Sequence, residues 1–370
     1  MDKAKLVLIA AESGRALAMS ARRGGYIPLV ADRFGDQDTL AVAEGHTLVD
    51  LSRPINGNKL ISALDDLLAG RDCTGIVCGS GFEDDAGLLA RINERWNLLG
   101  NMAEVVARIK NPLELAAICA SADVPHPETS LSPPANKTNW VVKRAGGSGG
   151  WHIRAADTVA DGGKDYYFQR RIDGVPVSAL MLCNGEGDVM VLGFTAQWSA
   201  PTPKHPFRYG GAVRPAELDE GIKASIISAA TRICREIALK GLNSADFMVD
   251  GGTFHLLEIN PRPSATFDLF EMEEKSLFAV HVEACAGVLP SQAPIYGSAL
   301  AGAIVYAERD LLAPSTEWAD WTADRPLAGS QIKAGQPVCS VFARAPDFRS
   351  ARRLVEERIA AVHELLDVRV

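Results

Sequence analysis

The first hundred residues alternate short apolar runs with stretches of helical periodicity. The apolar runs are KLVLIA, IPLVAD and GIVCGS, and between them lie SGRALAMSARRGG and a helical pattern near residues 59–68. Strands that alternate with helices form a parallel sheet with helices packed on its faces. We therefore expect residues 1–105 to form a doubly wound α/β domain. The first apolar run is short and charged residues follow it at once, so we interpret it as a strand and not as a signal peptide.

Polar residues follow each of these predicted strands. Glu12 and Ser13 follow the first strand, Asp32 follows the second, and Ser80 lies in the GSGFED stretch after the third. Ligands of open α/β sheets bind at the carboxyl ends of the strands, so these four residues are candidate substrate contacts. Ordinary roles in turns and loop caps would explain them equally well. No GxGxxG or P-loop motif is present here, so this domain is not predicted to bind a nucleotide itself.

Composition excludes several classes of function. The chain has 370 residues, of which 47% are hydrophobic and 23% charged, which predicts a soluble protein of two or three domains. Its net charge of -8 and the absence of a long basic run argue against a nucleic-acid partner. No stretch has the roughly 18 apolar residues that a membrane helix needs. The seven scattered cysteines predict reduced thiols and a cytoplasmic protein, and the sequence leaves a homodimer open.

The segment HLLEINPRPS, residues 255–264, has the pattern that points most directly to chemistry. Glu258, Asn260 and Arg262 occupy alternate positions directly after two leucines. Side chains two apart on a strand point to the same face, so these three polar groups would project together. Carboxylate and amide oxygens suit a hard cation, and a guanidinium suits the phosphates that such a cation neutralises. The alternative is the solvated face of an edge strand.

A glycine hairpin before this segment adds a second acid. Asp246 lies twelve residues before Glu258, on the preceding predicted strand. If residues 250–252 form a three-residue loop, Asp246 pairs opposite Leu256 and shares a face with Glu258 and Asn260. A two-residue loop would shift the register by one residue and move Asp246 to the other face.

A lysine and a glycine-rich turn form a third motif. Lys143 ends the β-rich run WVVK, and GGSGG follows at residues 146–150. Backbone N–H groups of a glycine-rich turn can approach phosphate oxygens closely, and a lysine at the adjoining strand end supplies a point charge. A flexible surface loop would account for the glycines as well.

Taken in their order along the chain, these motifs resemble the ATP-grasp superfamily. Lys110 precedes a helix and a proline-containing linker, Lys143 precedes the glycine loop, and QRRI at residues 169–172 ends a strand at the usual hinge position. The resemblance covers about residues 110–271. It implies a two-lobed ATP-grasp module over 106–300, with a smaller lobe at about 139–190 that covers ATP. A small β-rich segment and a helix, 301–370, would then pack on that module.

The resemblance also implies roles for individual residues. The hinge backbone would read the adenine, Asp173 would contact the ribose, and Arg262 and Lys143 would be catalytic, with Arg262 stabilising the transferred phosphoryl group. Asp246, Glu258 and Asn260 would hold two Mg²⁺ ions, for which Mn²⁺ can substitute. The expected ATP-binding residues are Lys110, Lys143, Gly146, Gly147, Ser148, Gly149, Gly150, Gln169, Arg170, Arg171, Ile172 and Asp173.

Three positions depart from the usual superfamily pattern. Arg144 stands where proline is frequent, Asp246 stands where glutamate is common, and Trp151 and His152 replace the small residues that often follow the loop. His152 either touches phosphate or substrate, or packs beneath Trp151.

Enzymes similar to this chain activate a carboxylate as an acyl phosphate, which a nucleophile then attacks. No Ser/His/Asp or Cys/His arrangement is evident, in keeping with chemistry that needs no side-chain nucleophile. Arg208 and Arg214 are candidates for orienting an acidic substrate, although each could equally be a surface ion-pair partner.

The N-terminal stretch and GSGFED look like a branch of predicted ATP-dependent carboligases related to biotin carboxylase, similar in type to tyramine-glutamate ligase. We therefore expect amide formation between a small carboxylate and an amine. Carboxylation with bicarbonate is the second hypothesis. A non-catalytic nucleotide-sensing module is a third hypothesis of a different class.

Overall fold

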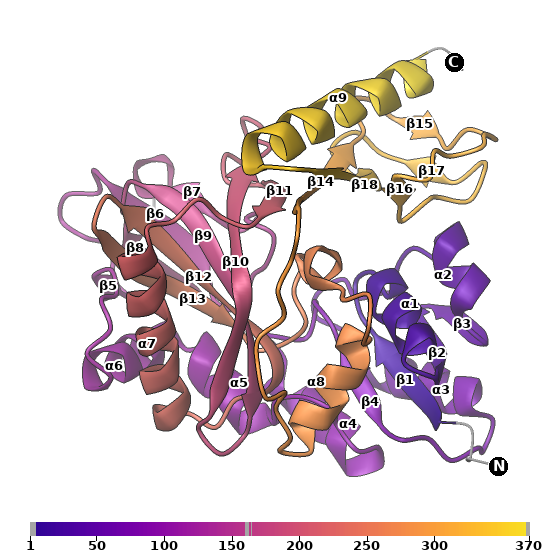
Figure 1. The fold of residues 1–370 in the computed structure, drawn as a ribbon, viewed down its shortest axis with the longest axis horizontal. Coiled ribbons are helices and arrows are strands. Elements are labelled where there is room, and N and C mark those ends of the chain that lie inside the picture. Colours follow the sequence, from indigo (N-terminus) through magenta and orange to yellow (C-terminus); the bar gives the residue numbers. More distant parts are fainter. Residues whose placement is uncertain (1–4, 160–162, 164, 368–370) are drawn as a thin grey trace.

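The N-terminal domain of the computed structural model has the expected parallel sheet. The structure describes residues 5–159, 163 and 165–367. Four parallel strands lie in the order β3-β2-β1-β4, and each strand is followed along the chain by one helix (Figure 1). Their bounds are β1 (Lys5–Ala10), α1 (Arg15–Arg23), β2 (Tyr26–Asp32), α2 (Gln37–Val42), β3 (Gly45–Leu48), α3 (Gly57–Leu68), β4 (Ile76–Cys78) and α4 (Ala86–Arg95). Residues 7–10 of the central strand β1 are fully buried, as a strand covered on both faces requires.

Two helices and a small antiparallel sheet come next. The sheet has the strand order β5-β8-β6-β7. These elements are α5 (Ala103–Lys110), α6 (Pro112–Ser121), β5 (Thr129–Ser130), β6 (Trp140–Arg144), β7 (Arg154–Ala155), the short 3₁₀ helix η1 (Ala156–Thr158) and β8 (Tyr166–Arg170). The small sheet therefore runs from residue 129 to 170, whereas the sequence placed the smaller lobe at 139–190. The difference arises because the next strand already belongs to the large sheet.

An eight-stranded sheet forms the centre of the molecule, in the order β13-β12-β9-β10-β11-β14-β18-β16. Its elements and their neighbours are β9 (Val175–Asn184), β10 (Val189–Ser199), β11 (Tyr209–Arg214), α7 (Glu220–Glu236), β12 (Lys240–Asp250), β13 (Thr253–Asn260), the 3₁₀ helix η2 (Phe267–Phe270), α8 (Leu277–Cys285), β14 (Ala299–Tyr306), β15 (Leu311–Leu312), β16 (Thr322–Ala323), β17 (Gln331–Ile332), β18 (Pro337–Ala345) and α9 (Phe348–Asp367). The C-terminal strands thus continue the sheet of the preceding module.

Both faces of this sheet are buried, and β9 shows how. Met181 and Cys183 face the core that contains α7, whereas Leu180 and Leu182 face the core that contains α1 and α8. Successive side chains of one strand therefore serve two separate cores. Figure 1 shows α8 between the large sheet and the N-terminal domain, and α9 over β14 and β18. Among the described residues, no helix is both long and apolar enough to cross a membrane.

Candidate active site

The hairpin of β12 and β13 brings the three predicted metal ligands together, but by a different route from the predicted one. Asp250 pairs with Thr253, so the loop has two residues and the predicted three-residue loop is wrong. A β-bulge between the strands then adds one residue on β13, and Asp246 pairs with Glu258 instead of Leu256. The bulge restores the shared face that the shorter loop would have removed. The Asn260 Nδ2 donates to Asp246 Oδ2 at 3.0 Å and to Glu258 Oε1 at 3.4 Å.

Two lysines surround this cluster with positive charge. The Lys110 Nζ, at the end of α5, donates to Asn260 Oδ1 at 3.1 Å. Lys143 is 5% exposed, and burial lowers the pKa of its ammonium group while Glu258 and Asp246 raise it. Burial raises the pKa of Glu258, but the two lysines outweigh it and bring that pKa down to about 2. Burial and then Glu258 raise the pKa of Asp246 to about 7.

The donor set fits a hard divalent cation. Asp246 Oδ1 is buried and has no hydrogen-bond partner, so one carboxylate oxygen lacks the compensation that burial normally requires. The cluster offers two carboxylates and one amide oxygen, which are the ligand types that Mg²⁺ prefers. Only two residues of this cluster, Asp246 and Glu258, are of the types His, Cys, Asp or Glu. Among the described residues, no group of three or more such residues could hold a metal ion.

A large cavity opens beside the cluster. It has a volume of about 790 Å³, within the usual range for small-molecule sites. Its walls include the glycine loop, the metal-ligand candidates and strand ends of the N-terminal domain. Predicted residues that line it are Glu12, Ser13, Ser80, Lys143, Gly147, Ser148, Gly149, Gly150, Asp246, Glu258, Asn260 and Arg262. Lys110 does not line the cavity and touches the cluster through Asn260 alone.

The glycine loop is packed against the rest of the protein, so its glycines are required by space as well as by conformation. Gly146, Gly149 and Gly150 have φ between 64° and 73°, a region that favours glycine. A Cβ at Gly150 would lie 1.8 Å from the Phe207 carbonyl oxygen. A Cβ at Gly147 would lie 2.2 Å from the ring of His152, so His152 packs directly beneath the loop.

The predicted hinge, residues 169–172, and the ribose candidate Asp173 lie outside the cavity walls. The Arg170 and Arg171 amides donate at 2.8 Å to the carbonyls of the residues that directly precede β5 and β6, Glu128 and Asn139. Among the described backbone hydrogen bonds outside regular elements, none has the Ile172 amide as donor. Gln169 is buried, with Nε2 3.5 Å from the Leu257 carbonyl oxygen, whereas the Asp173 side chain is 88% exposed.

Arg262 is held by a residue that the sequence analysis did not single out. Its Nε donates to Glu83 Oε1 at 2.5 Å, and Nη1 donates to the Pro263 carbonyl at 3.1 Å. Glu83 belongs to the GSGFED stretch of the N-terminal domain and is almost fully buried. Burial raises the pKa of Glu83, but Arg262 and Lys110 outweigh it and hold that pKa below its ordinary value. The sequence offered only an acid in the GSGFED stretch as a signal, whereas its burial, which demands a cationic partner, is a finding of the structure.

Three of the predicted substrate residues do not line the cavity and have structural partners instead. Asp32 is fully buried and accepts hydrogen bonds from the Gly14, Phe34 and Gly35 amides and from His46, so it anchors loops. Arg208 donates to the Ala200 and Gly335 carbonyls, and Arg214 donates to the Leu269 carbonyl. Each arginine also stacks on a tyrosine ring, with 3.7 Å and 3.8 Å to the ring centroids. We therefore reassign Asp32, Arg208 and Arg214 to packing.

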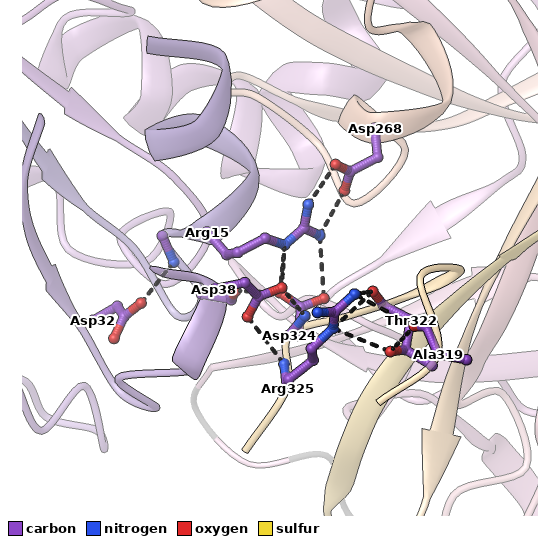
Figure 2. A network of polar contacts seen from close by, with 10 residues as sticks. Arg15, Asp32, Asp38, Asp268, Ala319, Thr322, Asp324 and Arg325 are labelled. Atoms are coloured by element: carbon purple, nitrogen blue, oxygen red, sulfur yellow. Dashed lines mark hydrogen bonds and ion pairs between the residues drawn. The ribbon is translucent and has the colours of Figure 1, made fainter. Parts of the chain in front are cut away.

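A second polar network is centred on Arg15 (Figure 2), and its residues Arg15, Asp268 and Asp324 also line the cavity. The Arg15 guanidinium makes two bonds of 2.6 and 2.8 Å to Asp268 and two bonds of 3.0 and 3.2 Å to Asp324. Burial lowers the pKa of Arg15, but the two carboxylates outweigh it and raise that pKa above its ordinary value. Sequence reasoning missed Arg15 because its partners lie 253 and 309 residues further along the chain.

Two further aspartates, the half-buried Asp38 and the buried Asp36, extend this network. Asp38 accepts from the Asp324 and Arg325 amides at 2.8 and 3.0 Å. Asp36 is 5% exposed and its Oδ2 has no hydrogen-bond partner. Burial, followed by the charges of Asp324 and Asp38, raises the pKa of Asp36 to about 8.

Solved structures with a similar fold include two nucleotide complexes. The fold is similar to biotin carboxylase from Campylobacter jejuni, solved with a β-γ-ATP ligand: 16% identity, TM-score 0.74, 95% of this chain and 90% of that one. It is also similar to an ADP complex of N5-carboxyaminoimidazole ribonucleotide synthetase: 16% identity, TM-score 0.72, 98% and 99% covered. A third similar structure is the L-amino acid ligase from Bacillus licheniformis: 14% identity, TM-score 0.73, 96% and 97% covered. No curated protein sequence matches this chain.

A family model identifies the central part of the chain. The model describes an ATP-grasp domain and matches residues 110–266. This range begins at Lys110 and ends just beyond Arg262, so it contains the lysines, the glycine loop and the bulged hairpin. The similar solved structures cover nearly the whole chain, from the parallel N-terminal domain to the last helix. Residues 110–266 are therefore an ATP-grasp domain, and the fold of the whole chain is similar to that of the three solved structures.

Proposed function

We propose that this protein is an ADP-forming ligase that activates a carboxylate with ATP and joins it to an amine. The observation that carries the proposal is the meeting of Asp246, Glu258 and Asn260 with two lysines beside a large cavity that Arg262 also lines. Phosphoryl transfer needs carboxylates that hold a cation next to positively charged side chains that hold phosphate, and this cluster has that arrangement. The L-amino acid ligase with this fold is in keeping with amide formation.

The proposed roles follow from the donor types. Asp246, Glu258 and Asn260 would hold two Mg²⁺ ions, with Mn²⁺ as a substitute, and the ions would neutralise phosphate charge. Lys143 would contact a phosphate oxygen from beneath the glycine loop, and Lys110 would hold Asn260 in place. Arg262, fixed by Glu83, would stabilise the transferred phosphoryl group and the acyl phosphate.

The proposed reaction has two steps. A substrate carboxylate oxygen attacks the γ-phosphorus of ATP, the bond to the β-phosphate oxygen breaks, and ADP leaves. The amine nitrogen then attacks the acyl carbon, phosphate leaves with the electrons of the C–O bond, and the nitrogen loses a proton. The glycine loop lines one side of the cavity, where it would shield an acyl phosphate from water.

The test is ADP release in the presence of pooled amino acids and pooled amines. We expect one acid and amine pair to stimulate ATP cleavage, and Glu258→Gln to reduce the stimulated rate at least about 100-fold. The matched control is Glu44→Gln, which alters a glutamate that pairs with Arg71 on the surface. If no pair stimulates cleavage and Glu258→Gln leaves the biological function intact, a nucleotide-sensing module replaces the ligase.

Bicarbonate-dependent carboxylation is the second candidate, favoured by the similar biotin carboxylase structures. Dependence of the same assay on added bicarbonate, with no amine required, would select it.

The partners and the compartment also belong to the proposal. The substrates are a small carboxylate and a small amine, and a homodimer is compatible with it. All seven cysteines are free thiols, which supports a reducing compartment and hence the cytoplasm.

A further inference from the structure

The tryptophan that follows the glycine loop packs on the opposite lobe. The Trp151 indole lies edge-on to the His205 ring, with 4.7 Å between centroids, and edge-on to the Tyr306 ring at 5.9 Å. The Arg208 guanidinium lies 5.4 Å from the Trp151 ring centroid and 3.7 Å from that of Tyr306. Trp151 therefore makes edge-to-face contacts with two aromatic rings and lies next to a guanidinium. Both the aromatic and the cation–π contacts are favourable.

The backbone beside Trp151 docks on the same segment. The Trp151 carbonyl oxygen lies 3.1 Å from His205 Nδ1, and the Tyr209 amide donates to the Gly149 carbonyl at 2.9 Å. Between them, Gly150 lies so close to Phe207 that no side chain fits. Residues 149–151 are thus attached at every position to residues 205–209, which lead into β11.

These contacts bridge two parts of the ATP-grasp domain. The glycine loop connects β6 and β7 of the small sheet, whereas β11 and Tyr306 belong to the large sheet. The docking side is fixed, because Arg208 donates to the Ala200 and Gly335 carbonyls and the Tyr306 hydroxyl donates to the Tyr209 carbonyl. The loop side consists of glycines and a serine, which lose the most conformational entropy when they are ordered. A large anchor at the end of such a loop can offset that cost.

We propose that Trp151 is a positioning residue that latches the glycine loop against the large lobe. Trp151 is 36% exposed, so it can leave the stack without opening a buried core. The next residue, His152, lies beneath Gly147 on the cavity side, so the latch also determines where this ring is held. The functional consequence rests on the proposed function: with the latch released, the loop no longer covers ATP, and water reaches the acyl phosphate.

The latch can be measured without any nucleotide. The Tyr209 amide donates to the loop, so its hydrogen–deuterium exchange reports whether the loop is docked. In nucleotide-free protein we expect Trp151→Ala to accelerate exchange of this amide about tenfold, and Trp151→Phe to accelerate it less. His205→Ala removes the ring on which Trp151 packs and should also accelerate exchange of the Tyr209 amide. Trp321→Ala is the matched control, because Trp321 is also half-buried beside an arginine but does not line the cavity.

Turnover then tests what the latch does. We expect Trp151→Ala to raise the KM for ATP about tenfold and to increase the ADP released per amide formed. Unchanged Tyr209 exchange in both Trp151→Ala and His205→Ala would overturn the latch. If calorimetry detects no Mg·ATP binding to the wild-type protein, the proposed function fails, whereas the exchange result still decides on the latch.

Discussion

Arg262 faces the cavity because a carboxylate from another domain holds it. Glu83 bonds the guanidinium at 2.5 Å, and its other carboxylate oxygen accepts from the Gly81 amide at 2.8 Å. The sequence motif predicted Arg262 from its alternate spacing with Glu258 and Asn260. It could not predict Glu83, because that pair is 179 residues apart and depends on how the N-terminal domain docks.

Glu83→Gln tests this support for Arg262. The amide keeps the shape but removes the charge, and charge-assisted hydrogen bonds contribute about 1.5–3 kcal/mol. We expect kcat to fall about 10- to 100-fold while calorimetric affinity for Mg·ATP changes less than threefold. Glu44→Gln is the control, because that glutamate pairs with Arg71 on the surface. An equal loss of affinity and kcat would mean that Glu83 supports the fold and not Arg262.

Asp36 should make the free energy of unfolding of the protein depend on pH. Its pKa is raised from 3.8 to about 8 by burial, followed by Asp324 and Asp38, so between about pH 4 and pH 8 the folded state binds a proton that the unfolded state lacks. The contribution to stability is therefore present at low pH and lost as pH rises, by at most about 1.4 kcal/mol per pH unit. Free energies of unfolding in urea at pH 5, 6.5 and 8 should show Asp36→Asn gaining stability relative to the wild type as pH rises. A constant difference between the two proteins would contradict the prediction.

The element that the sequence predicted least well is the β12–β13 hairpin. Its period of two correctly identified Glu258 and Asn260 as one face of β13, whereas Arg262 lies two residues beyond the end of that strand and not on it as predicted. The turn length was mistaken, since Gly251 and Gly252 alone make the loop. A bulge leaves no mark in a run such as HLLEIN, because an extra leucine suits either face of a strand buried on both sides.

The glycine loop gives a prediction at the same scale. Gly150→Ala would place a Cβ 1.8 Å from the Phe207 carbonyl at φ +73°, so the loop could not dock. We expect the KM for ATP to rise at least tenfold. Gly70→Ala is the matched control, because Gly70 has φ +75° and nothing within 4 Å of its added Cβ, and it should cost only about 1 kcal/mol of stability. Equal effects of both variants on KM would exclude the clash as the cause.

For the whole molecule, the order of domains was readable from the sequence, whereas their attachment was not. Alternating strands and helices predicted the parallel domain, and the motif order predicted the ATP-grasp domain. The contacts between them depend on single residues such as Arg15, which joins α1 to η2 and to the loop after β16. Such a residue has no periodicity, and a lone arginine after a strand has many ordinary explanations.

Arg15→Ala should therefore destabilise the molecule as a unit. It would leave the carboxylates of Asp268 and Asp324 unpaired within the domain junction, at a cost of about 3–5 kcal/mol. Urea unfolding should shift by this amount, whereas Arg71→Ala, which breaks an exposed pair with Glu44, should change stability by less than 1 kcal/mol. A small effect of Arg15→Ala would show that the three parts dock without this network.

The eight-stranded sheet has a consequence for biosynthesis. Strands β14, β18 and β16 complete a sheet whose other strands all precede residue 261. Arg15 pairs with Asp324, which is synthesised 309 residues later. At roughly 5–20 residues per second, a ribosome exposes Arg15 for many seconds before its second partner exists. Until then β11 is an open edge and the N-terminal domain is only partly anchored. The nascent chain therefore exposes the β11 edge until β14 has been synthesised.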